Sequence, residues 1–292
     1  MKIVVADTLE DEVLLEIKKL GEVSYRPSDL YAEMKTANVL IVRSATQVTE
    51  ALIRDAAALK AVIRAGVGLD NVDAAACNAK GVKVLNTPGA STNAVAELAV
   101  GFILCALRKI PQAHLSMKQG KWDKKSLIGN EAAGKTVGIV GYGRIGAQVG
   151  KLCSCLGMKV IYTNLHEVKD GIGTKVDFDS LLASSDIISI HTVLTEQTKG
   201  MFGQDAFAKM KQGSYLLNLA RGQIVDEGAL YDALKSGKLA GAALDVYWQE
   251  PYKGKLLELD NVIFTPHVGA STKEAQLRIG GEIVQILKEL KL

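Results

Sequence analysis

The chain has 292 residues, 48% of them hydrophobic and 23% charged, and its formal net charge is +3. This length accommodates two domains with separate cores, and the composition is typical of a folded globular protein and excludes a disordered one. The small net charge and the scattered basic residues argue against nucleic-acid binding, and no apolar run reaches the roughly 18 residues that span a bilayer.

The N-terminus and the cysteines indicate a reducing compartment. Residues 1–5 read as a strand and not as a signal peptide. The cysteines show neither C-x-x-C spacing nor adjacent histidines, so they are typical of small thiols and not of a metal site. We therefore predict a cytoplasmic protein that binds no metal and has no membrane partner. The cysteines are Cys77, Cys105, Cys153 and Cys155.

The first third of the chain alternates short apolar runs with helical segments. This alternation predicts a parallel sheet that is covered on both faces. Ligands of such a sheet bind beyond the carboxyl ends of its strands, where Arg43, Arg64 and Asn86 stand. The predicted strands are 3–6, 39–42, 61–63 and 82–85, and the predicted helices are 9–20, 49–57 and 73–80.

The next helix is predicted at residues 93–108, and it is apolar on nearly all sides. Because a helix that is apolar all round must be buried on all sides, we expect it to pack between domains or between subunits. The polar segment 118–134 follows and is predicted to be a linking arm.

A strand, a glycine-rich turn and a helix come next, at residues 136–156. The first glycine of the turn permits a tight bend, the second lets the backbone approach a pyrophosphate, and the third lets the helix pack on the strand. The helix N-terminus offers free N–H groups and a positive dipole end to the phosphates. We therefore predict a dinucleotide-binding site at Gly141, Gly143 and Gly146, within Gly141-Tyr142-Gly143-Arg144-Ile145-Gly146.

Asn164 follows the second strand of this unit, 18 residues beyond Gly146. A residue about 20 positions past the glycines meets the adenosine ribose, and its usual type is Asp or Glu. An amide can still bond the ribose hydroxyls, but it does not repel a 2′-phosphate. The strictness of NAD selectivity is therefore open.

The alternating pattern resumes after Asn164 and ends in a last helix. That helix opens with Ser271-Thr272-Lys273-Glu274, a capping box, and we expect it to cover the N-terminal domain. The predicted fold is α/β, with two doubly wound parallel-sheet domains and a Rossmann dinucleotide-binding domain inserted into a flavodoxin-like substrate domain. The predicted substrate domain comprises residues 1–91 and 271–292, and the dinucleotide domain 92–270. The predicted strands are 186–190, 214–218, 242–246 and 262–264, and the clearest helix is 227–236.

Three polar residues stand at strand ends of the second domain: Arg221, Glu250 and His267. Hydride transfer from an alcohol to nicotinamide requires a base for the hydroxyl proton, and histidine is suited by a pKa of about 6.5. A carboxylate beside it orients the ring and favours the imidazolium. Arginine supplies a planar fork for a substrate carboxylate.

These residues lie in stretches by which the chain resembles the D-isomer-specific 2-hydroxyacid dehydrogenase family, over nearly its whole length. The resemblance implies an NAD-dependent oxidoreductase that oxidises a phosphorylated 2-hydroxy acid, 3-phospho-D-glycerate, to 3-phosphohydroxypyruvate in serine biosynthesis. It also implies a homodimer, and we expect a short form without the C-terminal regulatory domains of longer relatives. The stretches are 42–46, 64–73, 86–88, 120–122, 220–227, 242–246 and 267–274.

The resemblance also implies a role for each site residue. His267 would be the acid/base, Glu250 its carboxylate partner and Arg221 the arginine that orients the substrate. Arg144 and Ile145 would lie along the pyrophosphate. The other cofactor contacts would be Asn164 at the ribose, Asp245 at the nicotinamide amide, and Thr192, Ala220 and Gly269. The substrate contacts would be Gly66 and Val67 N–H at the carboxylate, Arg43 and Arg64 at the phosphate, and Lys124 from the partner subunit.

Some residues depart from the family pattern. Val193 stands where a proline is usual, and Val67 and Lys124 replace a common Thr and Arg. Two alternatives remain open. One is a glyoxylate or hydroxypyruvate reductase, for which Arg43 and Arg64 would be superfluous, and the other is an NAD-sensing binding protein like the corepressors that share this fold.

Overall fold

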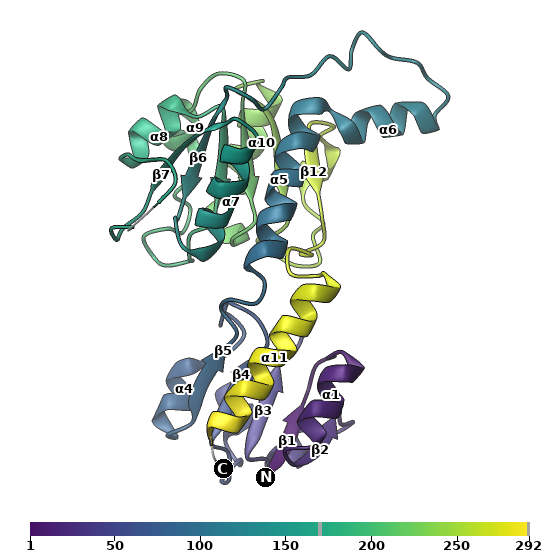
Figure 1. The fold of residues 1–292 in the computed structure, drawn as a ribbon, viewed down its shortest axis with the longest axis vertical. Helices are drawn as coiled ribbons and strands as arrows, with labels where there is room; N and C mark the ends of the chain where they lie inside the picture. The colour runs from purple at the N-terminus through teal and green to yellow at the C-terminus, as the bar shows by residue number, and fades with distance from the viewer. Residues whose placement is uncertain (169–170, 291–292) are drawn as a thin grey trace. The chain divides into compact units, whose positions relative to one another are not determined.

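The computed structural model describes residues 1–168 and 171–290 (Figure 1). The chain forms two compact units. The first unit is Met1–Thr92 with Ala270–Leu292, and the second unit is Asn93–Gly269. Each unit is built on one sheet in which all strand pairs are parallel. The predicted α/β class with two parallel sheets is therefore confirmed.

The sheet of the first unit has five strands in the order β2-β1-β3-β4-β5. This is the flavodoxin-like order, in which the strand order reverses between β1 and β3. β2 was not predicted, because its four residues, EVSY, carry no apolar run and lie at the sheet edge. The strands are β1 Lys2–Val5, β2 Glu22–Tyr25, β3 Val39–Val42, β4 Ala61–Arg64 and β5 Lys83–Asn86.

Helices cover both faces of this sheet and bury its apolar side chains. The last helix packs on the first unit through Ile279, Ile283 and Leu287, which share a core with α1. The cap of the last helix is one residue later than a capping box at Ser271 requires, since Thr272 Oγ1 accepts from Ala275 N at 3.1 Å. One face carries α1 Asp11–Lys18 and α11 Lys273–Leu290, and the other carries α2 Leu30–Met34, α3 Glu50–Ile53 and α4 Ala74–Ala79.

The sheet of the second unit has seven strands in the order β12-β11-β10-β9-β6-β7-β8. This is the Rossmann order with one added strand, and it reverses between β6 and β9. The strands are β6 Thr136–Val140, β7 Lys159–Thr163, β8 Thr174–Lys175, β9 Ile187–Ile190, β10 Ser214–Asn218, β11 Leu239–Leu244 and β12 Val262–Phe264.

The helices of the second unit also lie on both faces of its sheet (Figure 1). Alternate residues of each strand point to opposite faces, which produces two separate cores. One face carries α5 Thr92–Arg108 and α7 Arg144–Cys155. The other carries α8 Phe178–Ser184, α9 Gln204–Lys209, α10 Glu227–Lys235 and the short 3-10 helix η2 Lys255–Glu258, and η1 Gly222–Ile224 lies before α10.

Within this single chain the helix α5 is not buried on all sides, and its expected packing against another subunit stays a prediction. Ala99, Ile103 and Leu107 are buried in the second core, but Leu98 and Leu104 are only half-buried. A further helix, α6 Ile110–Lys118, was not predicted. It lies between α5 and the predicted linking arm, and it exposes large apolar side chains. Within residues 1–168 and 171–290, no helix combines the length and apolarity that a bilayer crossing requires.

Candidate active site

The glycine-rich turn lies where the strand order of the second unit reverses. Gly141 follows β6 with a φ of +89°, and a Cβ on it would lie 2.6 Å from Thr192 N, just after β9. A Cβ on Gly146 would lie 2.2 Å from Gly141 O. These close approaches explain why two glycines are required. They also show that Thr192, which was predicted to contact the cofactor, lies beside the turn.

Gly143 differs from the other two glycines. It precedes α7, which begins at Arg144, and no described atom lies within 4 Å of a Cβ placed on it. The backbone at Gly143 therefore faces open space at a helix N-terminus. Such a place fits the pyrophosphate of a dinucleotide. Arg144 is exposed and Ile145 half-buried in the first turn of the same helix.

Asn164 holds the glycine-rich turn from the neighbouring strand. Its Oδ1 accepts from Tyr142 N at 3.1 Å, and its Nδ2 donates to His166 O at 3.1 Å. The Tyr142 ring stacks on Tyr162 at 4.0 Å between ring centroids. Asn164 therefore supports the conformation of the turn, a contact that the sequence did not predict.

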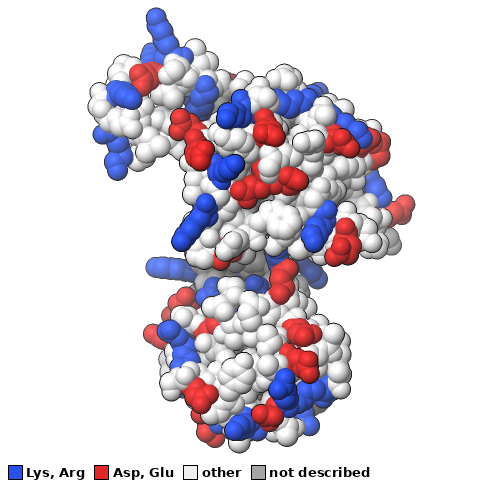
Figure 2. All heavy atoms as spheres, turned by 180° about the vertical axis from the view of Figure 1, so that it is seen from behind, with Lys and Arg blue, Asp and Glu red and all other residues white. Residues whose placement is uncertain are grey.

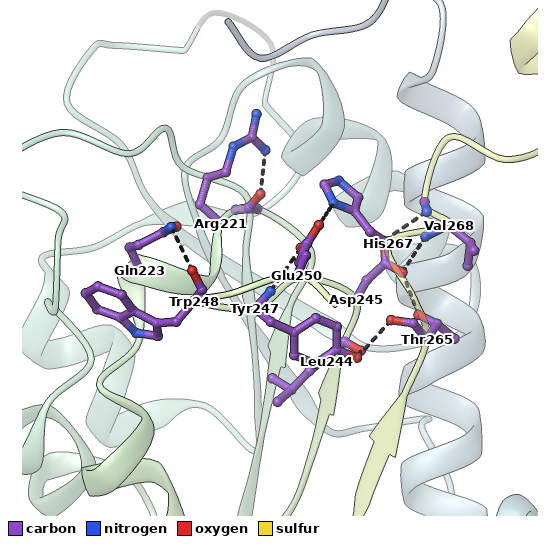
Figure 3. A network of polar contacts seen from close by, with 12 residues as sticks. Arg221, Gln223, Leu244, Asp245, Tyr247, Trp248, Glu250, Thr265, His267 and Val268 are labelled. Carbon is purple, nitrogen blue, oxygen red and sulfur yellow. Dashed lines mark hydrogen bonds and ion pairs between the residues drawn. The ribbon is translucent and has the colours of Figure 1, made fainter. Parts of the chain in front are cut away.

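His267 and Glu250 form a direct pair in the second unit (Figure 3). Their Nδ1 and Oε2 atoms are 2.9 Å apart, and the side chains are 43% and 40% exposed. Glu250 Oε1 also accepts from Tyr247 N at 3.2 Å. The backbone of His267 is left-handed, with a φ of +54°. The structure thus brings this predicted pair together while leaving it accessible to a small molecule.

Asp245 anchors the 265–269 loop, which carries His267. It is 2% exposed, and its Oδ1 accepts from Thr265 Oγ1 at 2.5 Å and from Val268 N at 2.8 Å, while Oδ2 accepts from Gly269 N at 2.8 Å. Hydrogen bonds to a carboxylate are stronger than those between neutral groups. Asp245 therefore fixes the residues on both sides of His267. The sequence singled out Asp245 and Gly269 only as cofactor contacts.

Tyr247 lies beside Asp245 and joins the same strand ends. Its hydroxyl is 2.9 Å from Leu244 O and 2.8 Å from Thr265 O. Burial, and then the negative charge of Asp245 and Glu250, raise the pKa of Tyr247 to about 12. The hydroxyl therefore remains protonated and can donate to these carbonyls.

Arg221 enters the network through its backbone. A Cβ on Gly222 would lie 2.0 Å from Tyr247 C, so the Arg221 segment packs directly on the backbone that leads to Glu250. The Arg221 guanidinium points away from that backbone, and its Nη1 donates to Ala220 O at 2.6 Å (Figure 3). The structure therefore places Arg221, Glu250 and His267 on three adjoining loops.

A cavity of about 560 Å³ adjoins the His267–Glu250 pair. Its remaining wall is mainly apolar, and it includes Tyr247, Tyr252 and Phe264. A partly apolar cavity beside a few polar groups is typical of a small-molecule site.

His191 is a neighbour of Thr192 that the sequence did not single out. Its Nε2 is 2.7 Å from Ser189 Oγ, while its buried Nδ1 has no hydrogen-bond partner among the described residues. Burial lowers the pKa of His191 to about 4. His191 is therefore neutral at physiological pH.

The predicted phosphate contacts lie in the first unit, at the ends of adjacent strands. Arg43 follows β3, and its Nη1 donates to Thr8 O at 3.2 Å. Arg64 ends β4 and folds over Gly66, because a Cβ on that glycine would lie 1.7 Å from Arg64 Nη1. Gly66 has a φ of +145°, and Val67 is exposed. One arginine thus lies directly beside the amides that were predicted to bind a carboxylate.

Lys124, which was predicted to reach the substrate of a partner subunit, lies in the exposed segment after α6. Figure 2 shows Lys and Arg interspersed with Asp and Glu over the visible face of each unit. Across residues 1–168 and 171–290, no group of three or more His, Cys, Asp or Glu side chains is arranged to hold a metal ion.

A Rossmann sheet, an inserted arrangement of two parallel-sheet units and a histidine–carboxylate pair define a dinucleotide-dependent dehydrogenase. The chain belongs to the D-isomer specific 2-hydroxyacid dehydrogenase family, whose NAD binding domain matches residues 100–269. The predicted family and the predicted cofactor, NAD, are thereby confirmed.

Relatives of known name support the same family. The chain is 46% identical over 291 residues to a D-3-phosphoglycerate dehydrogenase of Archaeoglobus fulgidus, covering 96% of this chain and 55% of that protein. It is 49% identical over 259 residues to a hydroxypyruvate reductase of Thermotoga maritima, covering 87% of this chain and 85% of that protein. The chain therefore spans about half the length of the first relative and most of the second.

A solved structure shares the fold. It is a D-lactate dehydrogenase of Aquifex aeolicus complexed with NAD and lactic acid, with a TM-score of 0.89 and 29% identity. The match covers 99% of this chain and 95% of the other. The chain therefore shares its fold with a structure that holds NAD.

Proposed function

We propose that the protein is an NAD-dependent dehydrogenase that oxidises 3-phospho-D-glycerate to 3-phosphohydroxypyruvate, a step of the phosphorylated pathway of L-serine biosynthesis. The observation that carries the chemistry is the accessible His267–Glu250 pair, which adjoins the Arg221 segment. The similarity to curated D-3-phosphoglycerate dehydrogenases supports the choice of substrate.

The proposed mechanism uses the two nitrogens of the His267 ring in different ways. Bound NAD would supply the acceptor for the hydride that leaves C2 of the substrate. Because Nδ1 faces Glu250, Nε2 is the nitrogen that takes the hydroxyl proton. Glu250 then stabilises the imidazolium and holds the ring in one orientation. Arg221 binds the substrate carboxylate and keeps the hydroxyl near His267.

The remaining substrate contacts come from the first unit. We assign the carboxylate to the N–H groups of Gly66 and Val67 as well, and the phosphate to Arg43 and Arg64. The position of the Arg64 guanidinium against Gly66 supports this, since one small substrate can then reach Arg64 with its phosphate and the neighbouring amides with its carboxylate. Two cations suit a phosphate, which carries nearly two negative charges at neutral pH.

The cofactor contacts follow the geometry of the glycine-rich turn. Gly143 with the N–H groups of Arg144 and Ile145 binds the pyrophosphate, and Asn164 lies at the ribose. Around the nicotinamide we assign Thr192, Ala220, Asp245 and Gly269. Asp245 Oδ2 accepts a hydrogen bond from Gly269 N, and a carboxylate oxygen has capacity for a second donor.

A reductase of hydroxypyruvate is the second candidate. The observation in its favour is the Thermotoga maritima relative, which this chain covers over 85% of its length. Both candidates use the same His267–Glu250 pair, and their substrates differ in whether they carry a phosphate. Arg43 and Arg64 favour the phosphorylated substrate.

A second copy of this chain is the proposed partner. The apolar side chains Leu98 and Leu104 of α5 are only half-buried, and Leu115 of α6 and Trp122 of the following arm are exposed. Exposed apolar side chains along one segment indicate association. In such a dimer Lys124 of this arm would reach the partner's substrate.

The test of the catalytic assignment replaces His267 by alanine. His267→Ala should lower kcat by about 10²–10⁴-fold, the usual effect of a positioned acid/base, while NADH binding stays unchanged. His114→Ala, at an exposed position of α6, is the matched control and should keep full turnover. A His267→Ala enzyme with near-normal kcat would disprove the assignment.

A further inference from the structure

The strand order of the first unit reverses between β1 and β3. In an open parallel sheet, ligands bind beyond the carboxyl ends of the strands at such a reversal. Here β1 leads to Asp7, and β3 leads to the 43–46 loop, which begins with Arg43. The conformation of this loop therefore decides what the reversal point presents to a ligand.

Asp7 holds the loop from the side of β1. It is 8% exposed. Its Oδ2 accepts from Arg43 N at 2.6 Å and from Thr46 N at 3.3 Å, and its Oδ1 accepts from Thr46 Oγ1 at 2.6 Å. A buried carboxylate needs such donors, because an unpaired charge is costly away from water. Asp7 therefore fixes both ends of the loop.

Asn71 holds the same loop from the side of β4. It is also 8% exposed, and its Nδ2 donates to Arg43 O at 2.8 Å and to Thr46 O at 2.7 Å. The backbone carbonyl of Asn71 accepts from Val48 N at 2.8 Å, and this hydrogen bond fixes the position of Asn71. The N–H and C=O groups of the first and last loop residues are thus held from opposite sides. We call this pair of residues the Asp7–Asn71 clamp.

The clamp leaves the middle of the loop available. Ser44 and Ala45 are exposed, and Arg43 is half-buried with its guanidinium on Thr8 O. The side chains of Asp7 and Asn71 bond to the backbone of the loop and to the Thr46 hydroxyl. They therefore affect a ligand indirectly, by fixing the conformation of the loop.

We propose that Asp7 and Asn71 are positioning residues that set the selectivity of the enzyme for a phosphorylated substrate. They fix the backbone from which Arg43 reaches the phosphate, and this inference rests on the function proposed above. The chemistry of each residue matters. An amide at position 7 carries no negative charge, so the hydrogen bonds from Arg43 N and Thr46 N lose their charge assistance and the Thr46 hydroxyl must change from donor to acceptor. A carboxylate at position 71 faces two carbonyl oxygens.

The test compares kcat/KM for phosphohydroxypyruvate with that for hydroxypyruvate, with NADH in excess. Asp7→Asn and Asn71→Asp should each lower this ratio about tenfold or more, mainly through KM for the phosphorylated substrate. The values for hydroxypyruvate should change less than about threefold, because that substrate has no phosphate for Arg43 to bind.

Asn38→Asp is the matched control. Asn38 precedes the opposite end of β3, where its Oδ1 accepts from Lys2 N at 2.7 Å and its Nδ2 donates to Ala58 O at 3.4 Å. The control should lower thermal stability without changing the substrate ratio. Amide hydrogen exchange at Arg43 and Thr46 gives a second measurement, and it should accelerate in Asp7→Asn but not in the control.

Different failures are distinguishable. If the wild-type enzyme prefers phosphohydroxypyruvate and the clamp variants keep that preference, or lose activity on both substrates equally, the clamp does not set selectivity. If the wild-type enzyme shows no such preference, the proposed substrate is wrong and the inference falls with it. Unchanged exchange at Arg43 and Thr46 in Asp7→Asn would overturn the clamp itself.

Discussion

Replacing Asp245 by asparagine tests whether the 265–269 loop depends on this buried carboxylate. The loop holds His267 at a φ of +54°, a left-handed conformation that costs a non-glycine residue about 1 kcal/mol or more. The three hydrogen bonds to Asp245 offset this cost, since each is charge-assisted and contributes about 1.5–3 kcal/mol.

The magnitude follows from the geometry of the asparagine side chain. Its oxygen can still accept from Thr265 Oγ1 and Val268 N, but its NH₂ group then faces Gly269 N–H, donor to donor. At least one charge-assisted bond is lost, about 1.5–3 kcal/mol. If that free energy comes from the preference of the loop for its native conformation, kcat should fall by about 10- to 100-fold.

The assay measures kcat with phosphohydroxypyruvate at saturating NADH and the Kd of NADH by fluorescence. Thr265→Val removes one of the three donors and should produce a smaller decrease of kcat than Asp245→Asn. A kcat within about twofold of wild type would refute the reasoning. A weakened NADH affinity with unchanged kcat would show instead that Asp245 serves the nicotinamide.

Three further predictions use the same network and the cofactor turn. Arg221→Lys should lower kcat/KM because the planar fork is lost although the charge remains, and an unchanged value would remove Arg221 from the substrate. NADH should be preferred but NADPH used measurably, and Asn164→Asp should sharpen the preference; equal kcat/KM ratios in the two proteins would exclude Asn164 from the ribose site. Burial lowers the pKa of His191 to about 4 in the folded protein, whereas a histidine of the unfolded chain takes up a proton below about pH 6.5. The free energy of unfolding should therefore decrease as the pH falls from about 6.5 to about 4. Between those pH values the free energy of unfolding, measured in urea, should therefore decrease by about 1–3 kcal/mol more in the wild type than in His191→Gln, and parallel pH profiles of the two proteins would contradict this.

The parts of the fold that the sequence predicted correctly have local signatures. The β6 strand, the glycine-rich turn and the α7 helix follow one another without a break, and each has its own pattern of residue types. β2 and α6 were missed because their residues carry no clear apolar period. α5 was predicted as a helix, but its degree of burial depends on what packs against it.

The candidate site divides in the same way. Arg221, Glu250 and His267 were predicted because polar residues at the carboxyl ends of parallel strands face ligands. The contacts of Asp245 with the 265–269 loop, and of Asp7 with the 43–46 loop, join residues that are 20 or more positions apart in the chain. No local pattern indicates such a contact, since it depends on which strands become neighbours in the sheet.

The most direct test of the account is the ratio of kcat/KM for phosphohydroxypyruvate to that for hydroxypyruvate, measured with NADH in the wild type, Arg43→Ala and Arg64→Ala. We predict that the wild type prefers the phosphorylated substrate and that each variant reduces the ratio by about tenfold or more, mostly through KM. If the wild type shows no preference, or if both substrates lose activity equally in both variants, the arginines do not bind a phosphate. The protein would then be a dehydrogenase of another 2-hydroxy acid.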